Sequence, residues 1–241
     1  MEDKTRVVAF DVDGTLLKGL HYSWSILWQA IGGESEQAKK VRKQFMQGKI
    51  SYPDWCEADC QELKKGGLTQ EKVKLAIRQS GTTLTKNLRN GITRLKQYGF
   101  KVVIISGGAD CVLQSFLPDL FDLFDEVWMN RFIFNEKTGM LDTIIPTPYD
   151  WDDSKLGVKG KRVGFETVCE KYGANAKDSV FVGDDENDFS AMQSAGMKIY
   201  YNTDRLNAKE KAAGLPERVM IIDKDDLSAV VEEICVWSKK I

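Results

Sequence analysis

The stretch F-D-V-D-G-T-L at residues 10–16 decides the fold class, because it closes the short apolar run R-V-V-A-F that begins at Arg6. A run that is hydrophobic on both faces is typical of a central strand in a buried parallel sheet. Asp11 and Asp13, two residues apart at the end of this strand, point the same way. Gly14 then lets the backbone turn sharply. Doubly wound folds bind ligands at the carboxyl ends of their strands, so the stretch predicts a site built around two carboxylates.

The rest of the chain repeats this strand pattern between helical segments. Four further runs rich in β-branched and aromatic residues begin at Phe100, Ser179, Met197 and Val219. Amphipathic segments of helical length lie between them, for example at residues 87–98 and at residues 163–172, the latter followed by Gly173 as a stop signal. This alternation predicts an α/β fold with a doubly wound, Rossmann-like parallel sheet.

One long interval interrupts the alternation. Between residues 17 and 80 there is no convincing strand, only helical patterns rich in Lys, Glu and Gln. We predict that this interval, 17–80, is a helical cap domain inserted into a catalytic core made of residues 1–16 and 81–241. A second irregular stretch, N-R-F-I-F-N-E-K-T-G-M-L-D-T-I-I-P from Asn130, places Thr138 and Gly139 between two alternating apolar runs, which predicts a β-hairpin flap.

Composition narrows the class of protein further. The chain has 241 residues, a formal net charge of -2 and 42% hydrophobic residues, which is typical of an ordinary globular protein and gives no reason to expect nucleic acid or an anionic membrane as a partner. No stretch reaches the roughly 20 apolar residues that span a bilayer, and the N-terminus lacks a secretory apolar region. The five cysteines are odd in number and irregularly spaced, so we expect no disulfide framework, no zinc site and a cytoplasmic location.

Three further polar motifs accompany the first one, and each is weak by itself. G-D-D-E-N-D at residues 183–188 follows an apolar run and, taken alone, reads as a loop with a helix cap. Ser106 and Gly107 end another strand just before a helix, where a hydroxyl and backbone N–H groups suit a phosphate oxygen, although most such pairs are simply turns. Lys161, taken alone, reads as a solvated surface lysine. Three of the four motifs fall at strand ends on one edge of the predicted sheet, so we predict a joint site.

The order of these motifs resembles the four-motif signature of the haloacid-dehalogenase superfamily. D-V-D-G-T-L, then S-G-G, then Lys161 at 23 residues before Asp184 in G-D-x-x-N-D, follow that signature over nearly the whole chain. Lys159 is the second candidate for the motif lysine, since a Lys-Gly pair also begins there. The helical insertion, the S-G-G motif and the N-R-F-I-F hairpin resemble the phosphoserine phosphatase branch in particular.

The resemblance implies a Mg²⁺-dependent phosphatase in which Asp11 becomes transiently phosphorylated. A divalent cation must bridge a carboxylate and a phosphate, because both are negative, and Mg²⁺ prefers oxygen ligands. By resemblance, Asp13 acts as acid and then as base. The implied metal ligands are the side chains of Asp11 and Asp184 and the backbone carbonyl of Asp13. The remaining implied roles are phosphate binding for Ser106, Gly107 and Lys161, a substrate contact for Asn187, and support of the metal loop for Asp188.

Other functions stay open at this point. One alternative is a non-catalytic phosphate-binding protein, but the intact set of motif carboxylates and lysine argues against it. A phosphotransferase differs only in what accepts the phosphoryl group from Asp11, and an ion pump would need membrane spans. The expected substrate is a small phosphorylated metabolite, while its identity and the oligomeric state are left open.

The predicted cap departs from the branch that it resembles. Phosphoserine phosphatases use a glutamate shortly after the first motif for the ammonium group and a cap arginine for the carboxylate. Here Leu20 and His21 stand where the acid should fall, and residues 52–63 contain Glu57, Asp59 and Glu62 but no arginine.

A pocket with acidic groups in place of a guanidinium would repel a carboxylate. We therefore predict that phosphoserine is a poor substrate, and that esters with an apolar or cationic leaving group are preferred. Trp24 and Trp28 are candidate contacts for that group, with packing inside the cap as the simpler interpretation. Phosphoserine phosphatase activity is the alternative.

Overall fold

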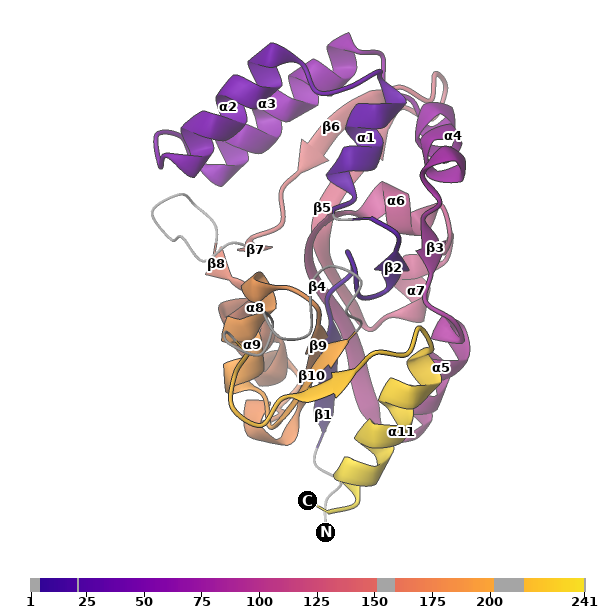
Figure 1. The fold of residues 1–241 in the computed structure, drawn as a ribbon, viewed down its shortest axis with the longest axis vertical. Coiled ribbons are helices and arrows are strands. Elements are labelled where there is room, and N and C mark those ends of the chain that lie inside the picture. The colour runs from indigo at the N-terminus through magenta and orange to yellow at the C-terminus, as the bar shows by residue number, and fades with distance from the viewer. Residues whose placement is uncertain (1–4, 21, 151–158, 202–214, 241) are drawn as a thin grey trace.

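The computed structural model describes residues 5–20, 22–150, 159–201 and 215–240. Its centre is a seven-stranded sheet in the order β11-β10-β9-β1-β4-β5-β6, in which every pairing is parallel except the antiparallel pair of β5 and β6 (Figure 1). The strands are β1 (Arg6–Phe10), β4 (Phe100–Ala109), β5 (Glu126–Phe134), β6 (Leu141–Ile145), β9 (Val180–Gly183), β10 (Met197–Tyr201) and β11 (Met220–Ile222). The predicted doubly wound α/β sheet is confirmed.

Helices occupy the intervals between the strands. They are α1 (Trp24–Ala30), α2 (Glu36–Met46), α3 (Tyr52–Lys65), α4 (Gln70–Ser80), α5 (Leu88–Gln97), α6 (Asp110–Gln114), α7 (Leu120–Leu123), α8 (Lys161–Lys171), α9 (Phe189–Ser194) and α11 (Leu227–Ser238), with short 3-10 turns η2 (Ala176–Asp178) and η3 (Glu186–Asp188). The predicted helix at residues 163–172 therefore begins earlier, at Lys161.

Alternate residues of the central strands point to opposite faces of the sheet, and both faces are buried. Val8 and Phe10 of β1 belong to the core that packs against α5 and α11. Val7 and Ala9 belong to a second core, which packs against α8 and α9. Figure 1 shows these two pairs of helices on opposite sides of the sheet. This two-sided burial explains why the strands appear in the sequence as nearly continuous apolar runs.

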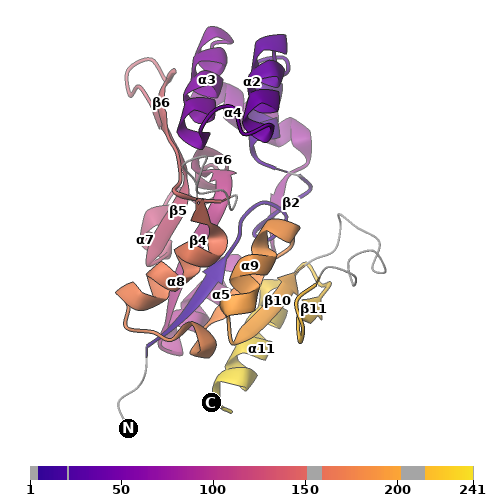
Figure 2. The same ribbon diagram turned by 90° about the vertical axis from the view of Figure 1, so that its left-hand side faces the viewer.

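The interval at residues 17–80 folds into α1, α2, α3 and α4. Three of these helices begin at a hydroxyl residue that caps them: Ser35 accepts a hydrogen bond from the N–H of Ala38, Thr69 accepts one from the N–H of Lys72, and Ser51 forms a capping box with Asp54. Figure 2 shows α2 and α3 at the opposite end of the molecule from the chain termini.

The same interval contains one short strand that the sequence did not predict. β2 (Leu17–Lys18) pairs antiparallel with β3 (Thr83–Leu84). The two segments are where the chain leaves the sheet and returns to it. Two residues of strand are too few to show any periodicity, so only the pairing of the two crossing segments reveals them.

The predicted hairpin is present, but it is part of the main sheet. β5 pairs parallel with β4 and then continues as the first strand of the hairpin with β6, in which Arg131 lies opposite Ile145. Gly139 in the turn has φ of +67°, a conformation that favours glycine. β6 also packs against α3. The hairpin thus links the sheet to the helices of residues 17–80.

No helix among the described residues combines the length and apolar character needed to cross a bilayer. The five cysteines all lie in described residues and form no disulfide with one another.

Candidate active site

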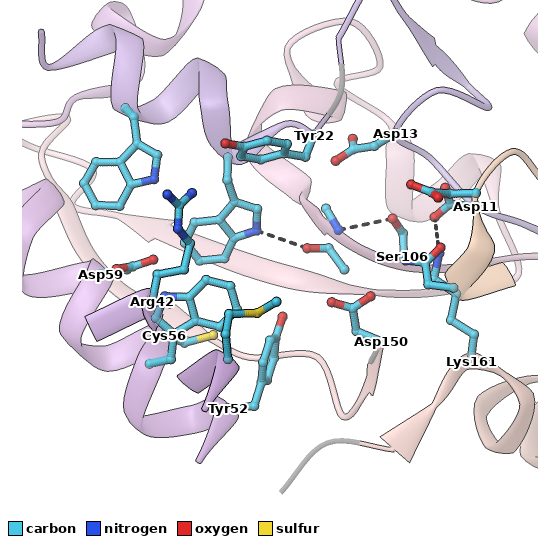
Figure 3. Close-up of a pocket in the computed structure, with 18 of the residues that line it drawn as sticks. Asp11, Asp13, Tyr22, Arg42, Tyr52, Cys56, Asp59, Ser106, Asp150 and Lys161 are labelled. Atoms are coloured by element: carbon cyan, nitrogen blue, oxygen red, sulfur yellow. Dashed lines mark hydrogen bonds and ion pairs between the residues drawn. The ribbon is translucent and has the colours of Figure 1, made fainter. Parts of the chain in front are cut away.

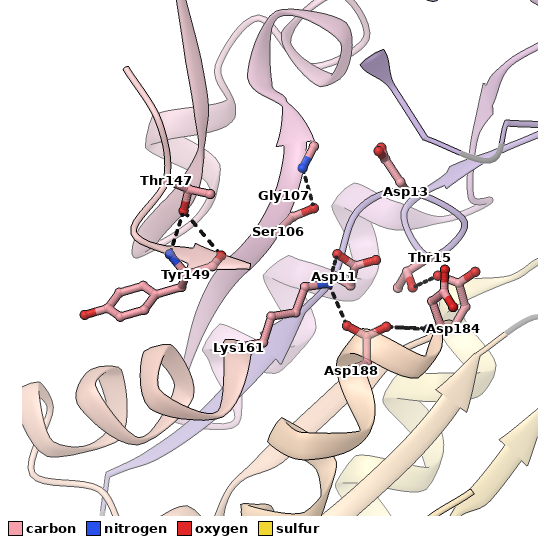
Figure 4. Close-up of polar contacts among 12 residues, drawn as sticks. Asp11, Asp13, Thr15, Ser106, Gly107, Thr147, Tyr149, Lys161, Asp184 and Asp188 are labelled. Atoms are coloured by element: carbon pink, nitrogen blue, oxygen red, sulfur yellow. Dashed lines mark hydrogen bonds and ion pairs between the residues drawn. The ribbon is translucent and has the colours of Figure 1, made fainter. Parts of the chain in front are cut away.

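Two neighbouring strands, β1 and β9, and the short turn η3 bring the predicted carboxylates together. Asp11 follows β1 and Asp184 follows β9, while Asp188 ends the short turn η3. Carboxylate oxygens of these three residues lie within 4.8 Å of one another, and the residues are 3%, 2% and 0% exposed (Figure 4). Three buried like charges repel one another strongly, so the cluster requires cations.

Lys161 supplies one of those cations. It is the first residue of α8, is 1% exposed, and places Nζ at 2.7 Å from Oδ1 of Asp11 and at 2.7 Å from Oδ1 of Asp188. Burial by itself lowers the pKa of Lys161, but the two carboxylates outweigh it and the pKa is raised, so the lysine stays protonated. Lys159, the second candidate, is exposed. The structure therefore places Lys161 at the carboxylate cluster and Lys159 outside it.

Asp188 holds the loop that carries Asp184. Its Oδ2 accepts hydrogen bonds from the backbone N–H of Asp184 at 2.9 Å and of Asp185 at 3.1 Å, while its Oδ1 contacts Lys161. Burial raises the pKa of Asp188 to about 7, against the opposing effect of Lys161. Both carboxylate oxygens are thus engaged by the protein, as expected for a supporting residue.

Gly14 is required by a close approach across the site. It has φ of +84°, and a Cβ atom there would lie 2.1 Å from Oδ2 of Asp184. Thr15, the next residue, donates a hydrogen bond from Oγ1 to Oδ1 of Asp184 at 2.9 Å. The glycine and the hydroxyl of the first motif therefore both serve to seat the carboxylate of the last one.

Asp13 is oriented by a residue that sequence reasoning missed. The backbone N–H and the hydroxyl of Ser23 donate to Oδ2 of Asp13 at 2.6 and 2.9 Å, and the Ser23 hydroxyl accepts a hydrogen bond from the N–H of Ala109 at 2.7 Å. Ser23 is fully buried and immediately precedes α1. It links Asp13 to the end of β4. A single serine in a loop carries no sequence signal for this role.

The S-G-G motif at residues 106–108 of β4 lies beside Asp11 and Asp13 at the same edge of the sheet. The hydroxyl of Ser106 accepts a hydrogen bond from the N–H of Gly108 at 3.1 Å. The carbonyl of Gly107 accepts hydrogen bonds from Nδ2 of Asn130 at 2.7 Å and from Nε1 of Trp24 at 3.1 Å. A Cβ atom on Gly107 would lie 2.1 Å from the carboxylate of Asp150, so only glycine fits there. These contacts fix the orientation of the Gly107 peptide at the edge of the pocket.

A cavity of about 560 Å³ opens over these residues (Figure 3). Asp11, Asp13, Ser106, Gly107 and Lys161 line it on the side of the sheet. The wall on the other side contains five aromatic residues: Tyr22, Trp24, Trp28, Tyr52 and Trp55. Two of them, Trp24 and Trp28, are the candidate contacts predicted from the sequence.

Asn187 also lines the cavity, and its Oδ1 is buried without a hydrogen-bond partner among the described residues. An unmade hydrogen bond of this kind suits a contact with bound substrate.

The charged residues on the far side of the cavity correct the sequence-based description of the cap. An arginine does line the cavity, but it is Arg42 of α2, outside the segment in which we looked for one, and its guanidinium lies 3.2 Å from Glu34. Of the four acidic residues of α3, only Asp59 lines the cavity, and it is 3% exposed. Leu20 is not among the lining residues, and His21 lies outside the described residues.

Comparison with known proteins identifies the family of the chain. Residues 5–196 match the family model of haloacid dehalogenase-like hydrolases. The phosphoserine phosphatase of Methanocaldococcus jannaschii is 31% identical over 234 residues, which cover 97% of this chain and 100% of that protein. The phosphoserine phosphatase of Rattus norvegicus is 26% identical over 209 residues, 85% of this chain and 86% of that protein.

Solved structures agree with the sequence comparison. A phospho-aspartyl intermediate analogue of phosphoserine phosphatase aligns with a TM-score of 0.62 at 26% identity, covering 96% of this chain and 100% of that one. A substrate-bound complex of phosphoserine phosphatase aligns with a TM-score of 0.62 at 27% identity, covering 97% and 100% of the two chains.

Proposed function

The chain belongs to the haloacid dehalogenase-like hydrolases and is a phosphatase, and we propose that it hydrolyses a small phosphate monoester by way of a phosphorylated Asp11. The observation that carries this proposal is the buried contact of Lys161 with Asp11 beside the carboxylate of Asp184. It provides a nucleophile, a fixed cation and further oxygen ligands at one strand edge. The similarity to a solved phospho-aspartyl intermediate analogue supports the assignment.

The residues around Asp11 fit a magnesium ion. The donor groups in the cluster are all carboxylate oxygens, which Mg²⁺ prefers, and one lysine alone leaves the cluster negative. Because both oxygens of Asp188 already accept hydrogen bonds, we propose the side chains of Asp11 and Asp184, with the backbone carbonyl of Asp13, as the protein ligands. When bound, the ion would offset the repulsion between the nucleophile and the phosphate.

The protein's own residues then divide the work as follows. Asp11 forms a bond to phosphorus while the bond from phosphorus to the leaving oxygen breaks. Asp13 gives that oxygen a proton, and later takes a proton from the water that cleaves the aspartyl-phosphate. Ser23 holds the Asp13 carboxylate through two hydrogen bonds, which limits its motion during both transfers.

Ser106, Gly107, Lys161 and Asn187 are the proposed contacts of the substrate. The hydroxyl of Ser106, the N–H of Gly107 and the ammonium group of Lys161 would bind phosphoryl oxygens, each contributing on the order of 3–4 kcal/mol if it tightens in the transition state. All four residues line the same cavity as Asp11 and Asp13, which supports a common site.

We also propose the division of the chain into a core of residues 1–16 and 81–241 and a cap of residues 17–80. Helices α1, α2 and α3 supply the far wall of the cavity, while Asp11 and Asp13 follow β1 and Lys161 begins α8. A cytoplasmic location is proposed as well, and the five unpaired cysteines support it.

Phosphoserine phosphatase activity is the narrower alternative, favoured by the names of the relatives. The lining of the cavity argues against it, because Asp59 lies in the wall and Arg42 is already paired with Glu34. Transfer of the phosphoryl group to an acceptor other than water would be recognised by product analysis, which separates free phosphate from a new ester.

The proposed function is tested with Asp11→Asn. The amide keeps the shape of the side chain but is neither nucleophilic nor charged, so we expect phosphate release from p-nitrophenyl phosphate in Mg²⁺ to fall at least about a thousandfold with the fold intact. Asp142→Asn is the matched control, because its side chain is exposed on β6 and outside the cavity. Phosphate release by Asp11→Asn within a few-fold of the wild type would refute a covalent role for Asp11.

A further inference from the structure

The aromatic residues Tyr22, Trp24, Trp28, Tyr52 and Trp55 form the wall of the cavity that faces the proposed phosphorylation site, and we call this part of the cavity the aromatic chamber. Ring contacts and a hydrogen bond hold its side chains in place. Trp24 and Trp55 stack with centroids 6.4 Å apart, and Phe45 stacks on Trp55 at 4.5 Å. The hydroxyl of Tyr52 is hydrogen bonded to the buried Asn130, which fixes the orientation of its ring. Fixed aromatic faces bind apolar groups and organic cations, and cations gain in addition from the negative face of each ring.

Asp59 gives this chamber a buried carboxyl group whose hydrogen-bonding capacity the protein satisfies only in part. Its side chain comes from α3, is 3% exposed and lines the cavity, and its Oδ1 has no hydrogen-bond partner among the described residues. Burial and Glu34 raise the pKa of Asp59 to about 8, against the opposing effects of Arg42 and of a hydrogen bond from Trp55, so the carboxyl group is largely protonated at neutral pH while the cavity is empty. A cation that enters the chamber favours the ionised form of Asp59 and supplies a hydrogen-bond donor for Oδ1.

Arg42 does not supply the missing partner. Its guanidinium lies 3.2 Å from Glu34, and the two side chains are 42% and 16% exposed, so its charge is offset by Glu34 and by solvent. Counted over the described lining residues, the cavity carries six carboxyl groups and two basic groups. A second negative charge on the substrate, in addition to the phosphate, would therefore meet repulsion rather than a free guanidinium.

We propose that the leaving alcohol of the substrate carries an alkylammonium group, which lies among the aromatic rings of the chamber with Asp59 as its counter-ion. Figure 3 shows Asp59 at the opposite end of the cavity from Asp11 and Lys161, so the alcohol must be long enough to span the cavity. This inference rests on the proposed function, since it names the alcohol that the same site releases.

The test compares ω-aminoalkyl phosphates of two to six methylene groups with n-alkyl phosphates of the same length. For the wild type we expect kcat/KM to favour the aminoalkyl ester over its neutral counterpart by at least about tenfold at the length that reaches Asp59. 2-Aminoethyl phosphate should also exceed phosphoserine, which differs from it by a single carboxylate. p-Nitrophenyl phosphate reports the basal reaction.

Two variants change the preference in opposite directions. Asp59→Asn should bring the ratio of aminoalkyl to alkyl ester close to one, because the amide has no charge. Arg42→Gln should raise the ratio, since it removes a like charge from the chamber. Glu57→Gln, on the same helix but exposed and outside the cavity, should leave the ratio unchanged. Using a ratio within each variant separates binding of the ammonium group from any general loss of activity.

The outcomes distinguish this inference from the proposed function. If p-nitrophenyl phosphate is hydrolysed but the wild type prefers the neutral esters at every length, the inference alone is overturned. It is also overturned if Asp59→Asn retains the wild-type ratio, or if phosphoserine exceeds 2-aminoethyl phosphate. If no ester is hydrolysed, both proposals fall. Should Asp59→Asn not fold, the wild-type series and Arg42→Gln still decide the question.

Discussion

Replacing Lys161 with methionine should destabilise the protein strongly, because it removes a buried cation that contacts two carboxylates. The side chains of Lys161, Asp11 and Asp188 are 1%, 5% and 0% exposed, so solvent does not screen the change. Removing one partner of a buried ion pair typically costs about 3–5 kcal/mol. For a chain of this size each kcal/mol lowers Tm by about 2–4 °C, which gives an expected loss of about 6–20 °C without metal.

The loss should depend on pH in a direction that the site determines. Burial already raises the pKa of Asp188 to about 7 in the presence of Lys161, and removing the lysine raises it further. A carboxyl group whose pKa is higher in the folded than in the unfolded protein favours folding at low pH, and that contribution disappears as pH rises through the folded pKa. Lys161→Met should therefore lose less stability at pH 5 than at pH 8.

The assay is urea and thermal unfolding in EDTA at pH 5 and pH 8, followed by circular dichroism, for the wild type, Lys161→Met and the exposed control Lys159→Met. We expect the control to remain within about 0.5 kcal/mol of the wild type. With Mg²⁺ present, p-nitrophenyl phosphatase activity of Lys161→Met should fall about a hundredfold to a thousandfold. Unfolding of Lys161→Met at pH 8 within error of the wild type, or a larger effect of Lys159→Met, would show that the reasoning is wrong.

Three further predictions follow from the same site. Ser23→Ala should lower kcat about tenfold with little change in KM, because Asp13 loses a hydrogen bond that orients it. An unchanged kcat in steady-state kinetics would contradict this prediction. Removal of metal with EDTA should abolish turnover, and added Mg²⁺ should restore it. Ca²⁺ should restore turnover poorly, because it takes more oxygen ligands at longer distances. Full activity after exhaustive chelation would exclude the proposed metal site. Asp59→Asn should gain on the order of 4 kcal/mol in stability relative to the wild type between pH 5 and pH 8. In this range Asp59 is ionised in the unfolded chain but still mostly protonated in the folded protein, where its pKa is about 8, so wild-type stability falls as the pH rises. The same difference in unfolding free energy between variant and wild type at the two pH values, measured with urea, would speak against it.

Most of the fold was predictable from the sequence, because it depends on local patterns. Strands buried on both faces appear as apolar runs, and the order of runs and amphipathic segments predicts a parallel sheet. The positions of Asp11, Asp13 and Asp184 just after strand ends follow in turn, since parallel strands align their carboxyl ends. Ser106 lies slightly earlier than expected, because β4 continues to Ala109. The carboxylate cluster was therefore expected before the structure was known.

Contacts between distant parts of the chain were not predictable in the same way. The choice between Lys161 and Lys159 depends on how α8 packs against β1. Lys161 contacts Asp11, although the two residues are 150 positions apart in the sequence. Ser23 gains its role only where the chain passes the end of β4, next to Ala109. Neither residue type nor spacing distinguishes these residues from their neighbours, because the signal is the position of another segment.

The substrate end of the cavity shows the same division most clearly. The sequence by itself determined that residues 52–63 are acidic and lack an arginine, but α3 turns Asp59 toward the cavity and leaves Glu57 exposed. The arginine that does reach the cavity, Arg42, comes from the neighbouring helix and arrives already paired with Glu34. Composition and periodicity are properties of a single segment, whereas the charge and shape of a pocket arise where several segments pack, and only the tertiary structure decides which side chains meet there.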